Sequence, residues 1–278
     1  MSDARVLWID GELQPADDAS LSVFDHGVTV GDGVFESLRT ERGEPFAVTR
    51  HLRRLHRSAD GLGLNVPFSD AELRDGIGDV LAANGGGEAR IRVTVTGGTG
   101  PPDSTRAADQ PKVIIATSEL TSWDPAAVVV TVPWRRNEHS PVAGLKTTSY
   151  AENVVALRNA RERGASEAIF ANTAGNLCEG TASNIFVGLR GQLITPPLSS
   201  GCLAGITREL LLEVTYSIEQ DLPLECLGDI DEGFLCSSTR DVQPIARLDG
   251  RDLTPCPGPL TTSAAAAFAG LVARTTDP

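Results

Sequence analysis

The sequence predicts a mixed α/β protein, and three stretches carry that prediction. Residues 89–96 alternate strictly between polar and apolar side chains, which is the pattern of a strand with one buried face. Residues 69–72 form a Ser-x-x-Glu capping box, which opens a helix. In residues 150–160, apolar side chains recur at helical spacing. Strands and helices are therefore expected to be mixed along the chain.

The first part of the chain is expected to hold two helices and several strands. Thr49 is a capping residue type and is expected to begin a helix that ends at the glycines of residues 61–63. The helix opened by the capping box is expected to end near residues 84–87. The expected strands are residues 6–10, 21–24, 34–40, 45–48, 89–96 and 112–117.

The second part begins after a connection that we expect to be a linker. We predict an N-terminal domain over residues 1–117, a linker over residues 118–126 and a C-terminal domain over residues 127–278. Helices are expected after residue 150, from residue 205 and over the alanine-rich residues 263–273. The expected strands are residues 127–132, 167–170 and 183–187, and the expected turns are residues 172–176 and 249–250.

Composition excludes several classes of protein. The 278 residues carry a net charge of −13, which argues against nucleic acid or an anionic membrane as a partner. The five cysteines form no CxxC pair, which fits a reduced, cytoplasmic protein. We see no signal peptide and no apolar run long enough to span a bilayer, and we expect no metal site.

Lys146 is the residue around which the other motifs are arranged. A lone lysine is normally a solvated surface charge. Apolar and small residues precede Lys146, and the apolar positions Tyr150, Val154, Leu157 and Ala160 follow it at helical spacing. The lysine is therefore expected where a strand or loop enters a helix.

Two further motifs follow that lysine. Residues 178–186 place Glu179 beside a short apolar strand, and residues 203–208 form a turn that leads into a helix. A reactive amine, an acid for a ring nitrogen and a phosphate-binding turn are the parts that a pyridoxal phosphate site needs. We therefore expect pyridoxal 5'-phosphate as cofactor.

Six motifs, taken in order, resemble the class IV aminotransferases, which are the fold-type IV pyridoxal phosphate enzymes. They are residues 25–39, 51–55, 144–146, 179–184, 205–208 and 238–244. This family includes branched-chain aminotransferases, D-amino acid aminotransferases, R-selective amine transaminases and aminodeoxychorismate lyases. The resemblance implies an N-terminal α/β sandwich, a short linker, a C-terminal pseudo-barrel and a homodimer.

The resemblance also implies the residues that hold the cofactor. Lys146 matches the Schiff-base lysine, which must be neutral to react and to move the α-proton. Glu179 matches the acid that pairs with the pyridine nitrogen and keeps the ring an electron sink.

Four residues match the phosphate contacts of the family. Arg54 matches the arginine that clamps the phosphate. The backbone N–H groups of Ile206 and Thr207 match the helix N-terminus of the phosphate cup, although Thr207 is also a helix-capping type. Ser238 matches a hydroxyl contact to the same phosphate.

The substrate contacts are implied less specifically. Arg92 aligns with a basic strand residue that meets substrate carboxylates, and we prefer it to Arg90 on the same strand face. Thr239 and Arg240 fall on a turn that binds the substrate carboxylate in branched-chain enzymes. A surface arginine remains the alternative for Arg240.

The sequence departs from the family in places that affect substrate choice. The D-amino acid enzymes have an Arg-x-His pair where this chain has residues 97–102, and a tyrosine where it has Val28. Branched-chain enzymes have a tyrosine one residue after the position of Tyr150. Glu36 stands where the best-known bacterial aminodeoxychorismate lyases have threonine. A glutamate there looks more like the transaminases and leaves lyase activity open, and we count Glu36 among the candidate substrate contacts.

Several functions remain open. The first is a transaminase that uses a D-amino acid, or an R-amine, with pyruvate or 2-oxoglutarate as acceptor. The alternatives are an aminodeoxychorismate lyase that makes 4-aminobenzoate and pyruvate, and a branched-chain amino acid aminotransferase. A protein of this fold used only for binding is disfavoured, since the lysine, glutamate and phosphate motifs are all present.

Overall fold

The computed structural model describes residues 5–106, 110–120 and 122–278, and these residues form two compact units. Unit 1 comprises the described residues before Ser122, together with Leu145–Tyr150 and Asp277. Unit 2 comprises Ser122–Gly144, Ala151–Thr276 and Pro278. The parts of the expected N-terminal domain and linker at residues 1–4, 107–109 and 121 lie outside the described residues.

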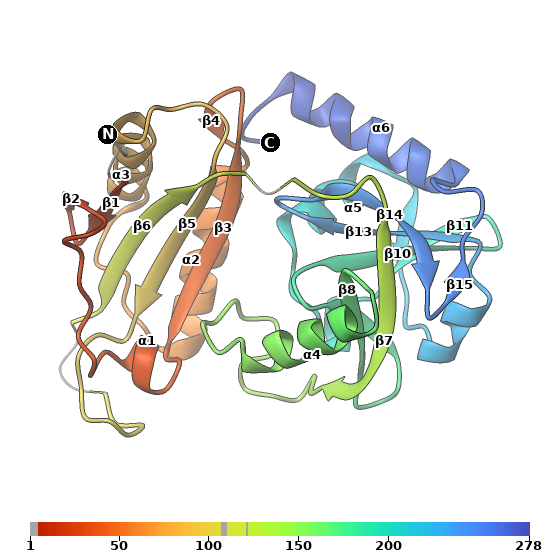
Figure 1. Ribbon diagram of the computed structural model, residues 1–278, viewed down its shortest axis with the longest axis horizontal. Helices are drawn as coiled ribbons and strands as arrows, with labels where there is room; N and C mark the ends of the chain where they lie inside the picture. The colour runs from red at the N-terminus through yellow and green to blue at the C-terminus, as the bar shows by residue number, and fades with distance from the viewer. Residues whose placement is uncertain (1–4, 107–109, 121) are drawn as a thin grey trace. The chain divides into compact units, whose positions relative to one another are not determined.

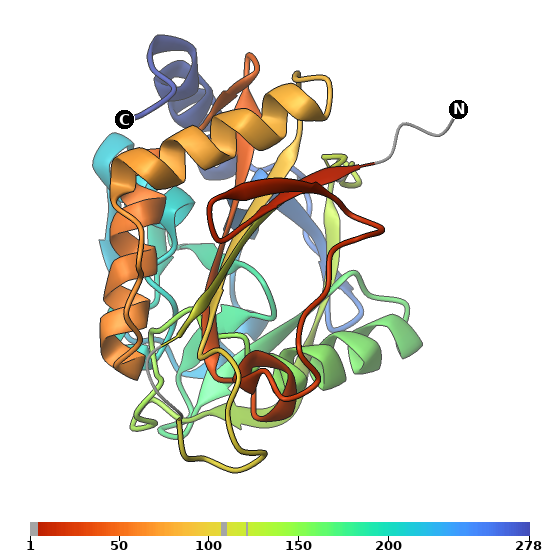
Figure 2. The same cartoon turned by 90° about the vertical axis from the view of Figure 1, so that its left-hand side faces the viewer.

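Unit 1 is one antiparallel sheet with helices α2 and α3 on one face (Figures 1 and 2). Its strand order is β2-β1-β6-β5-β3-β4. The elements are β1 (Val6–Ile9), β2 (Glu12–Pro15), α1 (His26–Thr29), β3 (Gly33–Glu41), β4 (Glu44–Pro45), α2 (Val48–Leu62), α3 (Asp70–Ala83), β5 (Arg90–Thr96) and β6 (Lys112–Ser118).

The alternation of β5 builds the core of unit 1. Ile91, Val93 and Val95 are fully buried and pack with apolar side chains of α2 and α3. On the neighbouring strand β3, Val34 pairs with Val95, and Glu36 pairs with Val93. Glu36 therefore lies on the buried, helix-facing side of the sheet, which requires buried partners for its carboxylate.

The lysine segment completes one edge of this sheet. Phe35 N donates to Lys146 O at 3.0 Å, Thr148 N donates to Gly33 O at 2.8 Å, and Val34 bridges Thr147. A second contact comes from α2, where Ser58 Oγ accepts a hydrogen bond from Lys146 N at 3.1 Å. The backbone at Lys146 is thus held by both the sheet and a helix.

Gly61 of α2 makes room for the neighbour of that lysine. A Cβ atom at Gly61 would lie 2.6 Å from Leu145 Cδ1. We expect Gly61→Ala to destabilise the protein by about 1–3 kcal/mol, because the lysine segment must shift. Gly78→Ala in α3 is the matched control: a Cβ there meets nothing within 4 Å, so better helix propensity should leave stability equal or higher. The urea unfolding midpoints of the two variants measure these effects. Equal midpoints would contradict the close contact between Gly61 and Leu145.

The helix predicted to begin at Thr49 begins one residue earlier, and its cap is different. The N-cap of α2 is Ala47, which has no capping side chain. The carboxylate of Asp277 fills that role instead: Oδ1 accepts from Thr49 N at 2.9 Å and Oδ2 accepts from Thr49 Oγ1. The predicted cap was wrong because its oxygen comes from a residue remote in sequence. The capping box of α3 is confirmed, with Ser69 and Glu72 bonded reciprocally.

Three other local predictions were wrong. Of the strand expected at residues 45–48, only Pro45 lies in a strand (β4), and Val48 already belongs to α2. Residues 21–24 form a turn, in which Asp25 N donates to Ser22 O at 3.0 Å, and not a strand. The helix after the lysine, α4 (Ala151–Glu162), begins where it was expected, but Val154, which was assigned to its apolar face, is 65% exposed. It buries Asn153 instead, because that side chain donates to Thr181 O at 2.8 Å.

Unit 2 contains a larger, mixed sheet (Figure 1). Its strands are β7 (Ala127–Arg136), β8 (Glu167–Asn172), β9 (Leu177–Gly180), β10 (Asn184–Leu189), β11 (Gln192–Thr195), β12 (Ser217–Glu219), β13 (Glu232–Ser237), β14 (Asp241–Leu248) and β15 (Arg251–Asp252). Its helices are α4, α5 (Ile206–Val214) and α6 (Pro259–Arg274), with 3₁₀ turns η1 (Leu198–Ser200) and η2 (Leu224–Gly228).

The order of these strands requires the sheet to curl. The sequence β12-β11-β10-β13-β14-β7-β8-β9 puts β9 at one end and β10 near the other. Only residues 181–183 join β9 to β10, and neighbouring strands lie about 4.8 Å apart, so a flat sheet is impossible. The curled sheet confirms the predicted mixed α/β class with a pseudo-barrel.

Two broader expectations concern membranes and disulfides. Among the described residues, we find no helix that is both long and apolar enough to cross a membrane. Cys178, Cys202, Cys226, Cys236 and Cys256 are all free thiols. Burial raises the pKa of the Cys202 thiol to about 11, so this side chain is a neutral thiol at physiological pH.

Candidate active site

In unit 1, the amine of Lys146 lies over an aromatic surface. Its Nζ is 4.3 Å from the centre of the Phe35 ring and donates a hydrogen bond to Tyr150 Oη at 3.3 Å. The two rings meet edge to face, with centres 5.2 Å apart. Tyr150 therefore contacts the Lys146 amine directly.

Arg92 reaches the same aromatic ring from β5. Its Cζ lies 3.8 Å from the centre of the Phe35 ring, and its Nε donates to Thr94 Oγ1 at 3.2 Å. Burial lowers the pKa of Arg92 from its ordinary value, and the charge of Arg90 lowers it further. The structure thus brings Arg92 and Lys146 together around one ring, whereas Arg90 pairs with Arg39 further along the strands.

Arg54, Glu36 and His51 form a buried polar cluster between α2 and β3. Arg54 Nε and Nη2 donate to the two carboxylate oxygens of Glu36, each at 2.7 Å. His51 Nδ1 lies 2.6 Å from Glu36 Oε2. Glu36 has no exposed surface, so its carboxylate orients Arg54 and His51 from inside the core.

Burial and the charges within this cluster shift the pKa values of Glu36 and His51. Burial by itself would raise the pKa of Glu36, but the charge and hydrogen bonds of Arg54, with those of His51, lower it to about 2. Burial lowers the pKa of His51 despite the opposing attraction of Glu36. Glu36 is thus ionised at neutral pH while His51 is neutral and donates its Nδ1 proton.

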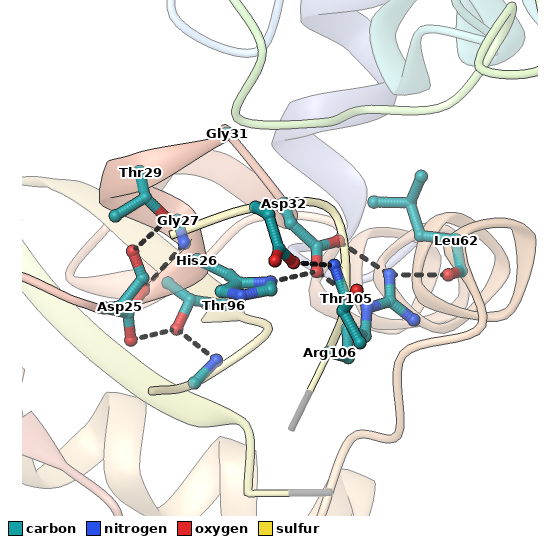
Figure 3. Close-up of polar contacts among 12 residues, drawn as sticks. Asp25, His26, Gly27, Thr29, Gly31, Asp32, Leu62, Thr96, Thr105 and Arg106 are labelled. Carbon is teal, nitrogen blue, oxygen red and sulfur yellow. Dashed lines mark hydrogen bonds and ion pairs between the residues drawn. The ribbon is translucent and has the colours of Figure 1, made fainter. Parts of the chain in front are cut away.

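A second polar network orders the start of β3 and the segment after β5 (Figure 3). The buried carboxylate of Asp25 accepts from Gly27 N and from Thr96 Oγ1, both at 2.8 Å. Asp32 accepts two hydrogen bonds from Arg106, at 2.7 Å from Nε and 2.6 Å from Nη2. These hydrogen bonds from Arg106 are the main reason that the pKa of Asp32 is lowered.

The same arginine joins this segment to the end of α2. Arg106 donates to Leu62 O at 2.7 Å and to Gly63 O at 2.8 Å. The segment after β5 is therefore held against the end of α2 by the guanidinium of Arg106. Val28, on α1, is 61% exposed.

In unit 2, Glu179 is held at the end of β9. Its Oε2 accepts from Leu203 N at 2.9 Å, and its Oε1 lies 3.4 Å from Arg136 Nε. The Arg136 guanidinium lies 4.3 Å from the centre of the Phe170 ring. A turn carboxylate in free solvent would lack these contacts, whereas Glu179 has a fixed orientation beside a cation.

The N-terminus of α5 offers backbone donors. Gly205 is its N-cap and supplies no capping side chain, and the first helical residues, Ile206 and Thr207, are buried. A Cβ at Gly205 would lie 1.9 Å from Asn184 Oδ1. Glycine is therefore required here, and it leaves first-turn N–H groups for an anion.

The turn after β13 carries the remaining predicted residues. Ser238 and Thr239 lie in this turn, where Arg240 N donates to Ser237 O at 3.1 Å. The Arg240 side chain is buried and donates to Glu167 Oε2 at 3.0 Å. This internal ion pair differs from the substrate salt bridge suggested by the sequence.

Sequence reasoning missed three residues that the geometry brings forward. Arg136 lies beside Glu179, His51 beside Glu36, and Glu167 beside Arg240. Arg136 and Glu167 lie on strands whose other residues are mostly apolar, and a charged residue in a buried strand was the available signal.

The comparison with protein families decides the identity of this arrangement. Residues 33–248 match the family described as amino-transferase class IV. The chain belongs to the class IV aminotransferases. The match covers Lys146, Glu179 and the α5 turn, so the predicted family is confirmed.

Class IV relatives with different activities resemble this chain over most of its length. A putative branched-chain-amino-acid aminotransferase of Methanocaldococcus jannaschii is 32% identical over 88% of each chain. A D-alanine aminotransferase of Bacillus licheniformis is 29% identical over 92% of this chain and 93% of its own. An aminodeoxychorismate lyase of Bacillus subtilis is 28% identical over 88% of this chain and 87% of its own.

Solved class IV structures share the fold. The branched-chain aminotransferase of Thermoproteus uzoniensis has a TM-score of 0.89 at 31% identity, covering 96% of this chain and 94% of its own. A T.th. branched-chain amino acid aminotransferase complexed with N-(5'-phosphopyridoxyl)-L-glutamate has a TM-score of 0.88 at 26% identity, covering 97% and 94%. Class IV aminotransferases depend on pyridoxal phosphate, so the predicted cofactor is confirmed.

Proposed function

We propose that this aminotransferase transfers the amino group of a D-amino acid to a 2-keto acid, with Lys146 carrying the cofactor. The observation that supports it most is the shared Phe35 ring. The Lys146 amine and the Arg92 guanidinium both lie over it, at 4.3 and 3.8 Å from its centre. A carboxylate bound at Arg92 would present the adjacent α-carbon toward the amine.

The residues fit pyridoxal phosphate by the chemistry of their donor groups. Lys146 is a primary amine in an aromatic setting, Glu179 is an oriented carboxylate, and α5 begins without a side-chain cap. We propose that the phosphate is bound by Arg54, the Ile206 and Thr207 N–H groups and the Ser238 hydroxyl. Bound pyridoxal phosphate supplies an electron sink for charge left at the donor α-carbon.

Each remaining residue then has a definable task. Glu179 keeps a proton on the ring nitrogen, and Arg136 and Leu203 N hold Glu179 in place. Lys146 Nζ removes and returns the α-proton, and Tyr150 Oη orients that amine by accepting its hydrogen bond. We propose that Glu36, being fully buried, acts through Arg54 and does not contact the substrate.

Thr239 and Val28 complete the proposed substrate contacts. Thr239 follows Ser238 on the turn after β13, where its backbone can bind a substrate carboxylate. Val28 is exposed on α1, beside other exposed apolar side chains of the same segment, among them Phe24. A second copy of the chain covering this surface is consistent with the proposed homodimer, which sedimentation of the purified protein tests.

Arg92 carries the largest predicted effect on donor affinity. We expect Arg92→Gln to raise KM for amino acids by about 10- to 100-fold, because a charge-assisted hydrogen bond to the carboxylate is lost. An R-amine, which has no carboxylate, should keep its KM. Arg90→Gln on the same strand face is the matched control and should change neither value. A larger rise in amino acid KM from Arg90→Gln than from Arg92→Gln would instead assign carboxylate binding to Arg90.

The donor is tested by a panel on the cofactor-loaded protein. D-alanine, L-leucine, an R-amine and aminodeoxychorismate are each supplied, the first three with pyruvate or 2-oxoglutarate as acceptor, and products are separated by chromatography. Fastest transfer from D-alanine supports the proposal. Release of 4-aminobenzoate and pyruvate from aminodeoxychorismate, without amino transfer from the other donors, would replace it with the lyase.

A branched-chain L-amino acid is the second candidate donor. It is favoured by the M. jannaschii relative at 32% identity and by the T. uzoniensis structure at 31%. The guanidinium of Arg106 is bound to Asp32 and to backbone carbonyls. It therefore does not replace the arginine of the Arg-x-His pair that D-amino acid enzymes have after this strand. Preferential use of L-leucine in the panel would establish this alternative.

A further inference from the structure

Glu167, the first residue of β8, is a buried carboxylate that collects hydrogen bonds from distant segments. It has no exposed surface. Its Oε1 accepts from Ala168 N at 3.1 Å, from Thr181 N at 3.0 Å and from Thr181 Oγ1. Its Oε2 accepts from Ser183 Oγ at 3.1 Å and from Arg240 Nη2 at 3.0 Å. The carboxylate is thus fully surrounded by donors.

The loop that Glu167 holds follows directly after Glu179. Residues 181–183 join β9 to β10, and Gly180 N donates to Ser183 O at 2.7 Å within that loop. The approach is close, since a Cβ at Gly180 would lie 3.2 Å from Glu167 Cδ. Glu167 thus packs directly against the residues that follow Glu179.

Arg240 links the same carboxylate to the turn of Ser238 and Thr239. Its Nη1 donates to Gln243 Oε1 at 2.6 Å, and its Cζ lies 3.8 Å from the centre of the Trp123 ring. Gln243 in turn donates to Asp124 O at 2.8 Å. The guanidinium is thereby fixed by an anion, an amide and an indole, all of unit 2.

We propose that Glu167 and Arg240 are a pair of positioning residues, which set the Ser238–Thr239 turn relative to the loop behind Glu179. This proposal rests on the proposed function, which gives Glu179 and Ser238 their cofactor contacts. It also removes Arg240 from the substrate contacts, because its guanidinium is engaged inside the protein. The substrate carboxylate is then left to Arg92 and to the backbone of the turn.

The geometry favours this role over a substrate salt bridge. A substrate carboxylate would have to displace Glu167 or Gln243, and either loss would leave a buried polar group without its partner. The Nε of Arg240 is buried and has no hydrogen-bond partner within the described chain, so this nitrogen does not face open solvent. Both facts point the guanidinium inward.

The test compares Glu167→Gln, Arg240→Gln and the double variant in the full-length protein. Cofactor dissociation constants are measured by titrating each cofactor-free protein with pyridoxal phosphate and following absorbance. KM and kcat are measured for the preferred amino acid and for an R-amine. The exposed pair Arg247–Asp252, which joins β14 to β15 at 2.6 Å, supplies the control variants Arg247→Gln and Asp252→Asn.

We expect each single change to weaken cofactor binding roughly tenfold or more, because the groups that hold the cofactor are displaced. The double variant should bind the cofactor no more weakly than the single variant with the lower affinity, since the pair acts as one unit. The KM ratio of amino acid to R-amine should stay unchanged, and Arg240→Lys, which keeps the charge, should recover part of the affinity. Variants at Arg247 and Asp252 should match the wild type.

Two outcomes would overturn the inference. The first is a selective rise in amino acid KM in Arg240→Gln that Glu167→Gln does not share, which would place Arg240 on the substrate. The second is additive effects in the double variant. If a single variant does not fold, Glu167→Leu with Arg240→Met tests the same pair without a lone buried charge. Failure of the wild-type protein to bind pyridoxal phosphate would instead refute the proposed function.

Discussion

Replacing Lys146 with alanine is expected to abolish covalent attachment of the cofactor and to slow amino transfer by roughly a thousandfold or more. In the proposed function this amine both carries the cofactor and moves the α-proton, so its loss removes both tasks at once. Borohydride treatment of the loaded protein, followed by peptide mass spectrometry, should mark the peptide that contains Lys146. The same treatment of the variant should mark none.

The chain offers a matched control for this experiment, because its only other lysine is Lys112. Lys112 Nζ lies 2.7 Å from Asp10 Oδ2, and its side chain is 44% exposed. Lys112→Ala should therefore retain both the covalent mark and the rate. A mark on the peptide of Lys112 in wild-type protein would refute the assignment of Lys146.

The second large effect is expected on stability, from Glu36→Gln. Arg54 would keep its buried charge and lose its anion, and breaking a buried pair in this way costs about 3–5 kcal/mol. Urea unfolding of the cofactor-free protein measures the loss. Glu44→Gln, at an exposed position of β4, is the control and should fall within about 0.5 kcal/mol of wild type.

The same change should alter the response to acid. The pKa of Glu36 is about 2 in the folded protein against an ordinary 4.5, so its ionisation stabilises the fold. That contribution is complete above pH 4.5 and is lost as the pH falls toward 2. Wild-type stability should therefore fall more steeply than that of Glu36→Gln in this window. Parallel pH profiles would contradict the lowered pKa.

A double variant at Glu36 and Arg54 tests whether the unpaired charge of Arg54 causes the loss of stability. Adding Arg54→Met to Glu36→Gln removes the unpaired charge, so the double variant should lose less stability than the two single losses combined. Additive losses would mean that the two residues contribute independently. Cofactor affinity is a separate readout here, because we propose that Arg54 also binds the phosphate.

Local patterns predicted much of the fold. The alternation of residues 89–96 placed Ile91, Val93 and Val95 in the core, and the capping box located the start of α3. Lys146 was expected where a loop enters a helix, and α4 does begin at Ala151. Each of these signals lies within a few residues of its effect, which is why a single sequence is enough to find it.

Contacts between remote residues escaped prediction. Asp277 caps α2 from 228 positions away, and the Arg240–Glu167 pair spans 73 positions. Whether Arg240 faces solvent or a buried carboxylate depends on the strand order of unit 2, which has no local signature. The exposed Val154 has a similar cause, because Asn153 is drawn inward by the loop at Thr181.

The pairing of Thr147 with Val34 has a consequence for the order in which the protein matures. Residues 33–35 of β3 complete their hydrogen bonds only with a segment that is synthesised more than a hundred residues later. Until then, a nascent chain or a fragment that stops at residue 120 would present bare backbone donors and acceptors beside Phe35. Such an edge readily recruits strands from other chains, so short fragments should be prone to aggregate. Solubility should recover once the chain extends past Tyr150.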